Sequence, residues 1–185
     1  MIAYRRYNYL MKINRRNFST IAFAAPLLIA CKNDPARAII GTKSPKLKAQ
    51  TIDGNFVHFG ELPRPTVVHF FGLWCGPCMA EMPVWQGAIK QIKNMGGIDI
   101  VQLHLGVVPS QYESLNKWND ALDADIKTPL ILDESREIGD QFQAFGTPTT
   151  ILIDKNQIIV EHFWSLNSGR NLSKLIDVAK ATIGQ

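Results

Sequence analysis

The sequence predicts an α/β domain in which helices flank a mixed β-sheet. Residues 66–71, TVVHFF, form the kind of unbroken apolar run that makes a strand buried on both faces, and a helical stripe follows them. A second apolar run, 98–108, comes after that stripe, and two extended runs, 149–154 and 158–164, precede a last amphipathic helix. Strands that alternate with helices in this way build layered α/β domains.

A β-hairpin is expected before the first of these strands, within residues 47–62. Asp53-Gly54 lies there between two short extended stretches, and this dipeptide is among the strongest signals for a two-residue hairpin turn. The alternation of apolar and polar side chains is only partial on the second stretch, at Phe56 and His58. The domain should therefore begin with a short hairpin.

The first helix is expected from Cys75 to the Gly96-Gly97 pair, where glycine stops it. Because this helix crosses over between two strands, 66–71 and 98–108 should run parallel. The buried face of the helix has helical spacing and consists of Met82, Trp85, Ile89 and Ile92.

A second helix should follow the strand at 98–108. Ser110 and Glu113 have the spacing of a capping box, in which each side chain binds a free backbone N–H at the start of a helix. The helix would then bury Leu115, Trp118 and Leu122.

The last third of the chain should complete the sheet. Residues 129–133, PLILD, are expected as a short strand, and a further helix should follow with Ile138, Phe142 and Phe145 on its buried face. The runs 149–154 and 158–164 should pair antiparallel. The final helix would bury Leu172, Leu175, Ile176, Ala179 and Ile183.

Residues 1–30 have the order of an export signal. A basic stretch after Met11 leads into an apolar run, 21–30, that is shorter than the roughly 20 residues of a membrane-spanning helix. The alternative, an amphipathic or buried helix, is disfavoured by Pro26 and by the lack of a polar face. Because Met11 begins a conventional signal, we expect it to be the true start of the protein.

Cys31 is a candidate lipidation site. Residues 28–31, LIAC, resemble a bacterial lipobox, which implies cleavage before Cys31 and a lipid on its sulfur; the alternative is a buried free cysteine. Residues 14–18, NRRNF, resemble a twin-arginine export motif, although an ordinary secretory route remains open, and 36–38, ARA, is a rival cleavage site that would release a soluble protein. We expect a tether over 31–46 and one domain over 47–185.

The charges argue against nucleic acid as a partner. The chain has 20 basic and 16 acidic residues, and five basic residues are the only charged ones before Cys31. The remainder therefore carries 15 basic and 16 acidic residues, which leaves no basic surplus to bind phosphate groups.

The cysteines indicate reactivity rather than structural cross-linking. Besides Cys31, the only cysteines are Cys75 and Cys78, and a bond between these two would close too short a loop to stabilise the fold much. A zinc half-site is the other alternative, but tetrahedral zinc needs four ligands. No second CxxC and no closely spaced pair exists among His58, His69, His104 and His162.

Cys75 is predicted to be the attacking cysteine, because a thiol attacks a disulfide only as the thiolate. It would lie exposed at a helix N-terminus, where free backbone N–H groups and the helix dipole stabilise an anion, and Pro77 fits the first turn. Cys78, one turn further along, is predicted to resolve the mixed disulfide and to be the more buried of the two.

Several motifs together resemble the thioredoxin family: WCGPC after a buried strand, Pro83 in the helix that follows, and GTPTTILID at 146–154. The N-terminal hairpin, the CxxCxxEMP run and PTTxLID resemble its membrane-tethered, extracytoplasmic branch, which includes TlpA and the cytochrome c maturation reductases. The resemblance covers 47–185. It implies a thioredoxin-like fold and a thiol–disulfide oxidoreductase with no cofactor other than its own Cys75–Cys78 disulfide.

The resemblance also implies a substrate-binding surface around the cysteines. Pro148 matches the family's cis-proline, so the backbone of Thr147 would pair with an incoming peptide; the alternative is an ordinary trans proline. Gly76 and Pro77 would belong to the same surface. Trp74 would pack beside the disulfide and shape the docking surface, unless it is only a core residue.

Glu81 and His69 are candidates for tuning the redox chemistry. Glu81 lies three residues after Cys78 on the same helix face and could raise the pKa of a thiol or relay its proton; the alternative is a solvated glutamate. His69 stands where thioredoxins have a buried Asp and the tethered branch often has Asn. It could accept the proton of Cys78, but a hydrogen-bonded core histidine is the favoured interpretation.

The Gly-Pro dipeptide between the cysteines matches thioredoxin and favours a reductant. Its substrates would be disulfides of exported proteins, and a membrane electron donor would keep it reduced outside the cytoplasm. The alternatives are an oxidant or isomerase of the same fold, a copper-delivery protein using Met79, Met82 and the histidines, and a peroxide-reducing enzyme. The last requires a peroxidatic cysteine in its own motif, and none is visible.

Overall fold

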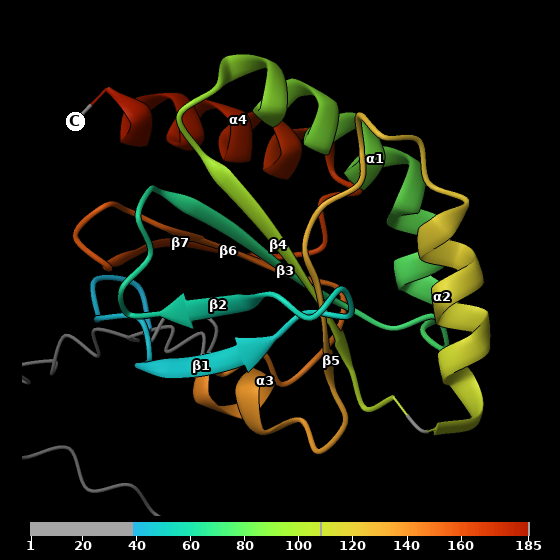
Figure 1. The fold of residues 1–185 in the computed structure, drawn as a ribbon. Coiled ribbons are helices and arrows are strands. Elements are labelled where there is room, and N and C mark those ends of the chain that lie inside the picture. Colours follow the sequence, from blue (N-terminus) through green and yellow to red (C-terminus); the bar gives the residue numbers. More distant parts are fainter. Residues whose placement is uncertain (1–38, 108, 185) are drawn as a thin grey trace, which may run out of the picture. The chain divides into compact units, whose positions relative to one another are not determined.

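The computed structural model describes residues 39–107 and 109–184, and its centre is a five-stranded mixed sheet (Figure 1). The strand order is β5-β4-β3-β6-β7, with β3, β4 and β5 parallel and β6 and β7 antiparallel to their neighbours. A separate antiparallel hairpin pairs β1 with β2. The strands are β1 Leu47–Gln50, β2 Phe56–Phe59, β3 Thr66–Phe71, β4 Asp99–Leu105, β5 Leu130–Asp133, β6 Thr149–Ile153 and β7 Ile159–Trp164.

Helices cover both faces of this sheet, as predicted. Figure 1 shows α1 (Gly76–Met95), α2 (Tyr112–Asp120) and α4 (Gly169–Ile183) on one face, and the hairpin with α3 (Glu137–Gln141) on the other. The central strand β3 is buried along its whole length, which explains its unbroken apolar run. The mixed sheet flanked by helices and the N-terminal hairpin are therefore confirmed.

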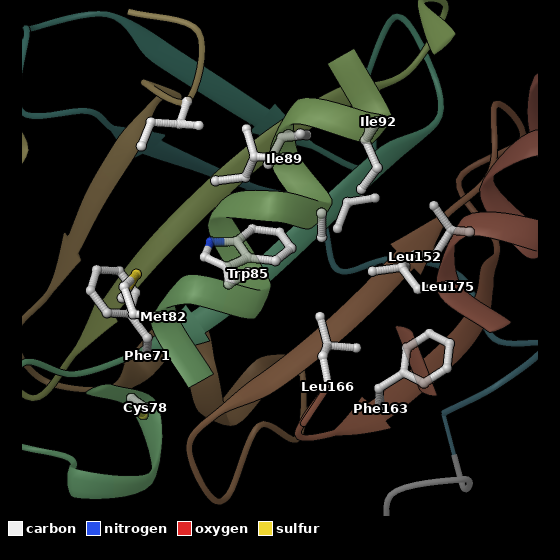
Figure 2. Close-up of a cluster of buried hydrophobic side chains, with 14 of the residues drawn as sticks. Phe71, Cys78, Met82, Trp85, Ile89, Ile92, Leu152, Phe163, Leu166 and Leu175 are labelled. Atoms are coloured by element: carbon white, nitrogen blue, oxygen red, sulfur yellow. The ribbon is translucent and has the colours of Figure 1, made fainter. Parts of the chain in front are cut away.

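The larger hydrophobic core lies between the sheet and α1 (Figure 2). Trp85 of α1 is fully buried in it, and alternate residues of β3, Val67 and Phe71, face it because side chains of a strand alternate between faces. Cys78 lies at one end of the same cluster, so packing of this core fixes the start of α1. The four residues predicted for the buried face of α1 are all buried: Met82, Trp85, Ile89 and Ile92.

The predicted turns occur where glycine was expected. Gly54 has a φ of 85° in the β1–β2 turn, and Gly96 has a φ of 67° just after α1, where its N–H binds the carbonyl of Lys93 at 3.1 Å. These backbone angles favour glycine because it lacks a Cβ atom.

The predicted capping box at Ser110 and Glu113 is wrong. The chain forms a short 3₁₀ turn, Pro109–Gln111, and α2 then begins with Gln111 as its N-cap and no capping side chain. Leu122, expected within this helix, lies beyond its end at Asp120. The 3₁₀ turn shifts the helix start past Ser110, so the expected reciprocal bonds cannot form.

The helix predicted around residues 138–145 is shorter than expected. It ends at Gln141, and Phe142 is buried against Phe59 and Phe70 with ring centroids 5.1 and 5.6 Å away. The chain then turns at Gln143, which has a φ of 53°. This turn takes Phe145 out of the apolar stripe, and Phe145 is 58% exposed rather than buried.

Residues 39–46, expected to be part of a tether, already contact the sheet. Ile39 is buried, Gly41 N–H donates to the carbonyl of Ile159 at 2.8 Å, and Ser44 N–H donates to that of Gln157 at 2.7 Å. These backbone contacts with the β6–β7 end of the sheet leave no periodic pattern in the sequence, which explains why they were not expected.

The predicted export signal, the Met11 start, the Cys31 lipidation site and the rival cleavage site at 36–38 lie outside the described residues. Within residues 39–107 and 109–184, no helix has the length and apolar character needed to cross a membrane.

Candidate active site

Cys75 and Cys78 form a disulfide where β3 gives way to α1. Their Cα atoms are 5.2 Å apart. Cys75 is the N-cap of α1 in an extended conformation, and its Sγ accepts the backbone N–H of Cys78 at 3.2 Å. Pro77 lies in the first turn, where its missing N–H costs no helical bond. The predicted strand, reactive turn and helix are therefore present, with Gly76 and Pro77 exposed beside the sulfurs.

Both cysteines are buried in this oxidised form. Cys78 is 2% exposed, but Cys75 is only 4% exposed, which contradicts the expectation that it is open to solvent. Part of the cover is the backbone of Thr147, whose carbonyl oxygen lies 3.5 Å from Cys75 Sγ. An incoming sulfur must therefore approach close to this backbone.

The peptide bond between Thr147 and Pro148 is cis, as the resemblance implied. The following residue, Thr149, begins β6, and its hydroxyl donates to the carbonyl of Gly146 at 2.8 Å. This hydrogen bond holds the 146–149 turn beside Cys75. The segment predicted to pair with a partner peptide thus adjoins the disulfide.

Trp74 is a surface residue rather than a core residue. Its side chain is 50% exposed, and its Nε1–H donates to the carbonyl of Leu105 at 3.0 Å. The ring lies over Gly72, where a Cβ atom would come within 2.6 Å of it. Trp74 is therefore held in one orientation next to Cys75, which favours the docking interpretation.

His104 is a site residue that the sequence did not indicate. It lies on β4 opposite Phe71 of β3, and its Nε2 accepts the backbone N–H of Leu73 at 2.9 Å. Together with the Trp74–Leu105 bond, this contact ties the loop before Cys75 to the end of β4. The Nε2 can accept only in the neutral imidazole, and burial lowers the pKa of His104 to about 4, which keeps it neutral.

Glu81 is buried, so the alternative of a solvated glutamate is wrong. Its side chain is 1% exposed on the inner face of α1. One carboxylate oxygen, Oε2, accepts the backbone N–H of Leu166 at 2.6 Å and also the hydroxyl of Ser165, while Oε1 is buried with no partner among the described residues. Glu81 therefore links the first half of α1 to the loop that follows β7.

His69 is a hydrogen-bonded core histidine. Its Nδ1 lies 2.9 Å from the hydroxyl of Thr150, and its ring stacks on Trp85 with centroids 4.1 Å apart. Burial lowers its pKa to about 3. The Trp85 Nε1–H in turn donates to Gln102 at 2.7 Å, so polar side chains of β6, β3 and β4 share one buried row. This arrangement favours the core interpretation over a proton relay to Cys78.

The residues considered for copper do not converge. Met82 is buried in the α1 core, Met79 packs against it, and His58 is exposed on β2. Within the described part of the chain, no group of three or more His, Cys, Asp or Glu side chains could hold a metal ion.

A family model described as AhpC/TSA matches residues 40–162, from the first packed residues to β7. The chain belongs to the AhpC/TSA family. The match includes the Cys75–Cys78 disulfide, Glu81 and the cis-proline, so the site described above lies within the family's shared region.

A curated relative indicates the enzyme class, and a solved structure shows the same fold. The thiol–disulfide oxidoreductase ResA of Bacillus cereus is 26% identical over 129 residues, covering 69% of this chain and 71% of the relative. A proposed thiol:disulfide interchange protein DsbE of Chlorobium tepidum superposes with a TM-score of 0.61 at 20% identity, covering 76% of this chain and 97% of that one. The thioredoxin fold and the enzyme class predicted from the sequence, thiol–disulfide oxidoreductase, are thereby confirmed.

The peroxidase alternative also has a structural neighbour. A 2-Cys peroxiredoxin of Plasmodium vivax has a TM-score of 0.58 at 16% identity, covering 77% of this chain and 95% of that one. This likeness concerns the fold alone. The only cysteines in the described part of the chain, Cys75 and Cys78, are bonded to each other one helical turn apart, which is the arrangement of a dithiol exchanger.

Proposed function

We propose that the protein reduces disulfides of exported proteins, using Cys75 as nucleophile and Cys78 as resolving cysteine. The observation that supports this most directly is the position of Cys75 Sγ at the N-terminus of α1, where it accepts the N–H of Cys78 at 3.2 Å. In the reduced protein the same N–H and the helix dipole would stabilise a thiolate on Cys75.

The reaction then follows from the geometry. The Cys75 thiolate attacks one sulfur of a client disulfide, which forms a mixed disulfide and releases the other client sulfur as a thiolate that takes a proton from water. Cys78, whose Cα lies 5.2 Å from that of Cys75, then loses its proton to water and attacks Cys75 Sγ as the thiolate. The second client sulfur leaves as a thiolate that takes a proton from water. The client gains two electrons and two protons, and the protein ends in the disulfide form described here.

The surface for the client is formed by Trp74, Gly76, Pro77 and the Thr147–Pro148 segment. The carbonyl of Thr147 is 3.5 Å from Cys75 Sγ, so an extended client segment that reaches this sulfur also reaches the backbone of Thr147. Such a segment could pair with it as a short strand. This pairing would orient the client disulfide for attack.

The direction of electron flow is tested by the reduction potential of the Cys75–Cys78 couple. The Gly-Pro dipeptide occurs in thioredoxin, at about −270 mV, whereas the oxidant DsbA lies at about −120 mV. We expect the couple to lie near the thioredoxin value when equilibrated with dithiothreitol redox buffers and followed by Trp74 fluorescence. A potential near that of DsbA would reverse the assignment and make the protein an oxidant.

The proposed place of this reaction is outside the cytoplasm, with the domain tethered by a lipid on Cys31. A membrane electron donor would then return the disulfide to the dithiol after each turnover. The support is the export-type order of residues 1–30 and the lipobox-like LIAC at 28–31. Mass spectrometry of the mature N-terminal peptide would refute the tether if it found an unmodified Cys31.

Glu81 is proposed to hold the Cys78 thiol in its protonated form. Residues three apart on a helix are neighbours on one face, and a carboxylate close to a thiol disfavours the thiolate form. Glu81→Gln keeps an oxygen for Leu166 N–H but removes the charge. We expect the pH of half-ionisation of Cys78 to fall, measured by thiolate absorbance in a Cys75→Ser background.

Glu113→Gln is the matched control, because Glu113 is an exposed carboxylate on α2 that pairs with Lys117. It should leave the ionisation of Cys78 unchanged. An unchanged or higher value in Glu81→Gln would show that Glu81 has only a structural role.

A further inference from the structure

Exposed aromatic side chains gather around the disulfide. Among the described residues, four large hydrophobic side chains are more than 40% exposed, namely Phe56, Trp74, Phe145 and Trp164. Three of them adjoin Cys75 or the turn that contacts it; only Phe56, on β2, belongs to another part of the domain. Exposed apolar groups that gather at one place usually mark an interaction site.

Trp164 belongs to this site although it is distant from Cys75 in sequence. It ends β7 opposite Thr149 of β6, and its ring covers Gly146, where a Cβ atom would come within 2.5 Å of the ring. Gly146 precedes Thr147, whose carbonyl contacts Cys75. Trp164 is nevertheless 41% exposed, so one side of the ring remains available.

Phe145 lies next to Gly146 on the same turn and is 58% exposed. Its backbone is held by Arg136, which donates through Nη2 to the carbonyls of Ala144 and Phe145 at 3.3 and 3.5 Å. The turn is therefore anchored while the Phe145 ring stays in solvent. On the other side of Cys75, Trp74 is fixed by its bond to Leu105.

We propose that Trp74, Phe145 and Trp164 form an aromatic docking surface that selects client segments with a large apolar residue beside the reacting cysteine. This inference rests on the proposed function, because the occupant is the client segment that must reach Cys75 Sγ. The segment would pass between Trp74 and the 145–147 turn, and its side chains would meet the exposed aromatic rings. Held aromatic side chains lose little conformational entropy on binding, which suits them as anchors.

The test compares two disulfide-linked peptides that differ only beside the cysteine, where one has Phe and the other Ser. Each rate with reduced protein is divided by the rate of the same variant with 2-hydroxyethyl disulfide, which has no side chain to dock. Contact between aromatic rings is worth about 0.5–1.5 kcal/mol, so we expect the unaltered protein to prefer the Phe peptide about three- to tenfold. Phe145→Ser and Trp164→Thr should each reduce this preference to less than about twofold.

Phe56→Ser is the matched control, because Phe56 is a comparably exposed ring on β2, in the hairpin on the face of the sheet opposite α1. It should keep the full preference. Equal rates for the two peptides in the unaltered protein, or a preference that survives both site variants, would overturn the docking surface. A protein that reacts with no disulfide, 2-hydroxyethyl disulfide included, would instead refute the proposed function.

Sedimentation of the reduced protein distinguishes a second copy as the occupant. If the aromatic rings serve self-association, Phe145→Ser and Trp164→Thr will shift a monomer–dimer equilibrium and leave the peptide preference intact. That result would overturn the proposal for clients. Monomers in all variants, together with the lost preference, would support it.

Discussion

Cys75→Ser is expected to slow the reduction of client disulfides to the rate measured without protein, because a serine hydroxyl does not ionise near neutral pH and cannot form the mixed disulfide.

Cys78→Ala is expected to stop the reaction after its first step. It retains the nucleophile but lacks the thiol that would attack Cys75 Sγ across a Cα–Cα distance of 5.2 Å. The client should therefore remain covalently attached to Cys75, and the complex can be isolated under non-reducing conditions.

The backbone bond from Cys78 N–H to Cys75 Sγ survives this substitution, so the nucleophile keeps its activating partner. We expect Cys78→Ala to form complexes at a rate close to that of the first step in the unaltered protein. Mass spectrometry of the trapped species would then identify the clients, and peptide mapping would show whether an apolar residue flanks the captured cysteine.

Two controls separate this outcome from unspecific cross-linking. A double variant, Cys75→Ser with Cys78→Ala, should trap nothing, and Cys31→Ser added to Cys78→Ala should trap the same clients. Complexes that persist in the double variant would assign the reaction to Cys31. If Cys75→Ser forms complexes and Cys78→Ala does not, then Cys78 is the nucleophile and Cys75 is the resolving cysteine.

Much of the fold was predictable because its signals are local in the sequence. The run TVVHFF can bury all of its apolar side chains only in a strand that is covered on both faces. The spacing of Met82, Trp85 and Ile89 predicts a helix with one apolar face, which packs against that strand. The chemistry was predictable for the same reason, since Cys75, Pro77 and Cys78 lie within one helical turn.

The one site residue that sequence reasoning missed, His104, and the actual burial of Glu81 and exposure of Phe145 depend on packing that local sequence patterns do not determine. His104 meets Leu73 because β4 pairs with β3 in a register that places His104 opposite Phe71, and no local pattern states that register. Glu81 lies on a helix face that could equally be solvated, until the loop at Ser165 and Leu166 closes over it. Phe145 continues an apolar stripe in sequence, but the turn at Gln143 directs it outward.

Stability of the oxidised protein is expected to fall steeply as the pH drops from about 6.5 to 4.5. Burial lowers the pKa of His69 to about 3 and that of His104 to about 4, whereas in the unfolded chain both imidazoles should have their ordinary value near 6.5. Between these values the unfolded chain binds protons that the folded protein excludes. The stabilisation is therefore complete above about pH 6.5 and is lost as the pH falls.

The expected loss approaches about 1.4 kcal/mol per pH unit for each histidine below pH 6.5, which amounts to about 4.5 kcal/mol for both between pH 6.5 and 4.5. Typical domains have only about 5–15 kcal/mol of stability, so the effect should be visible in urea unfolding at a series of pH values. Asp133 acts against this loss of stability at acid pH, because burial raises the pKa of its carboxyl and favours the protonated form in the folded protein. Protonation of His104 would also convert Nε2 from an acceptor to a donor and release Leu73 N–H beside the active site.

Substitutions show how much of the loss of stability at acid pH comes from these two histidines and how much from other titrating groups. His69→Asn and His104→Asn replace each buried imidazole with a polar group that does not titrate, so each should lower the slope by about 1.4 kcal/mol per pH unit, whatever it does to stability at pH 7.5. His58→Asn is the control because His58 is exposed on β2, and it should leave the slope unchanged. A free energy of unfolding that stays constant between pH 6.5 and 4.5, or a slope that neither buried variant reduces, would mean that both imidazoles accept protons in the folded protein. In that case the Leu73 N–H would need a different partner at acid pH, and the loop before Cys75 would not depend on a neutral His104.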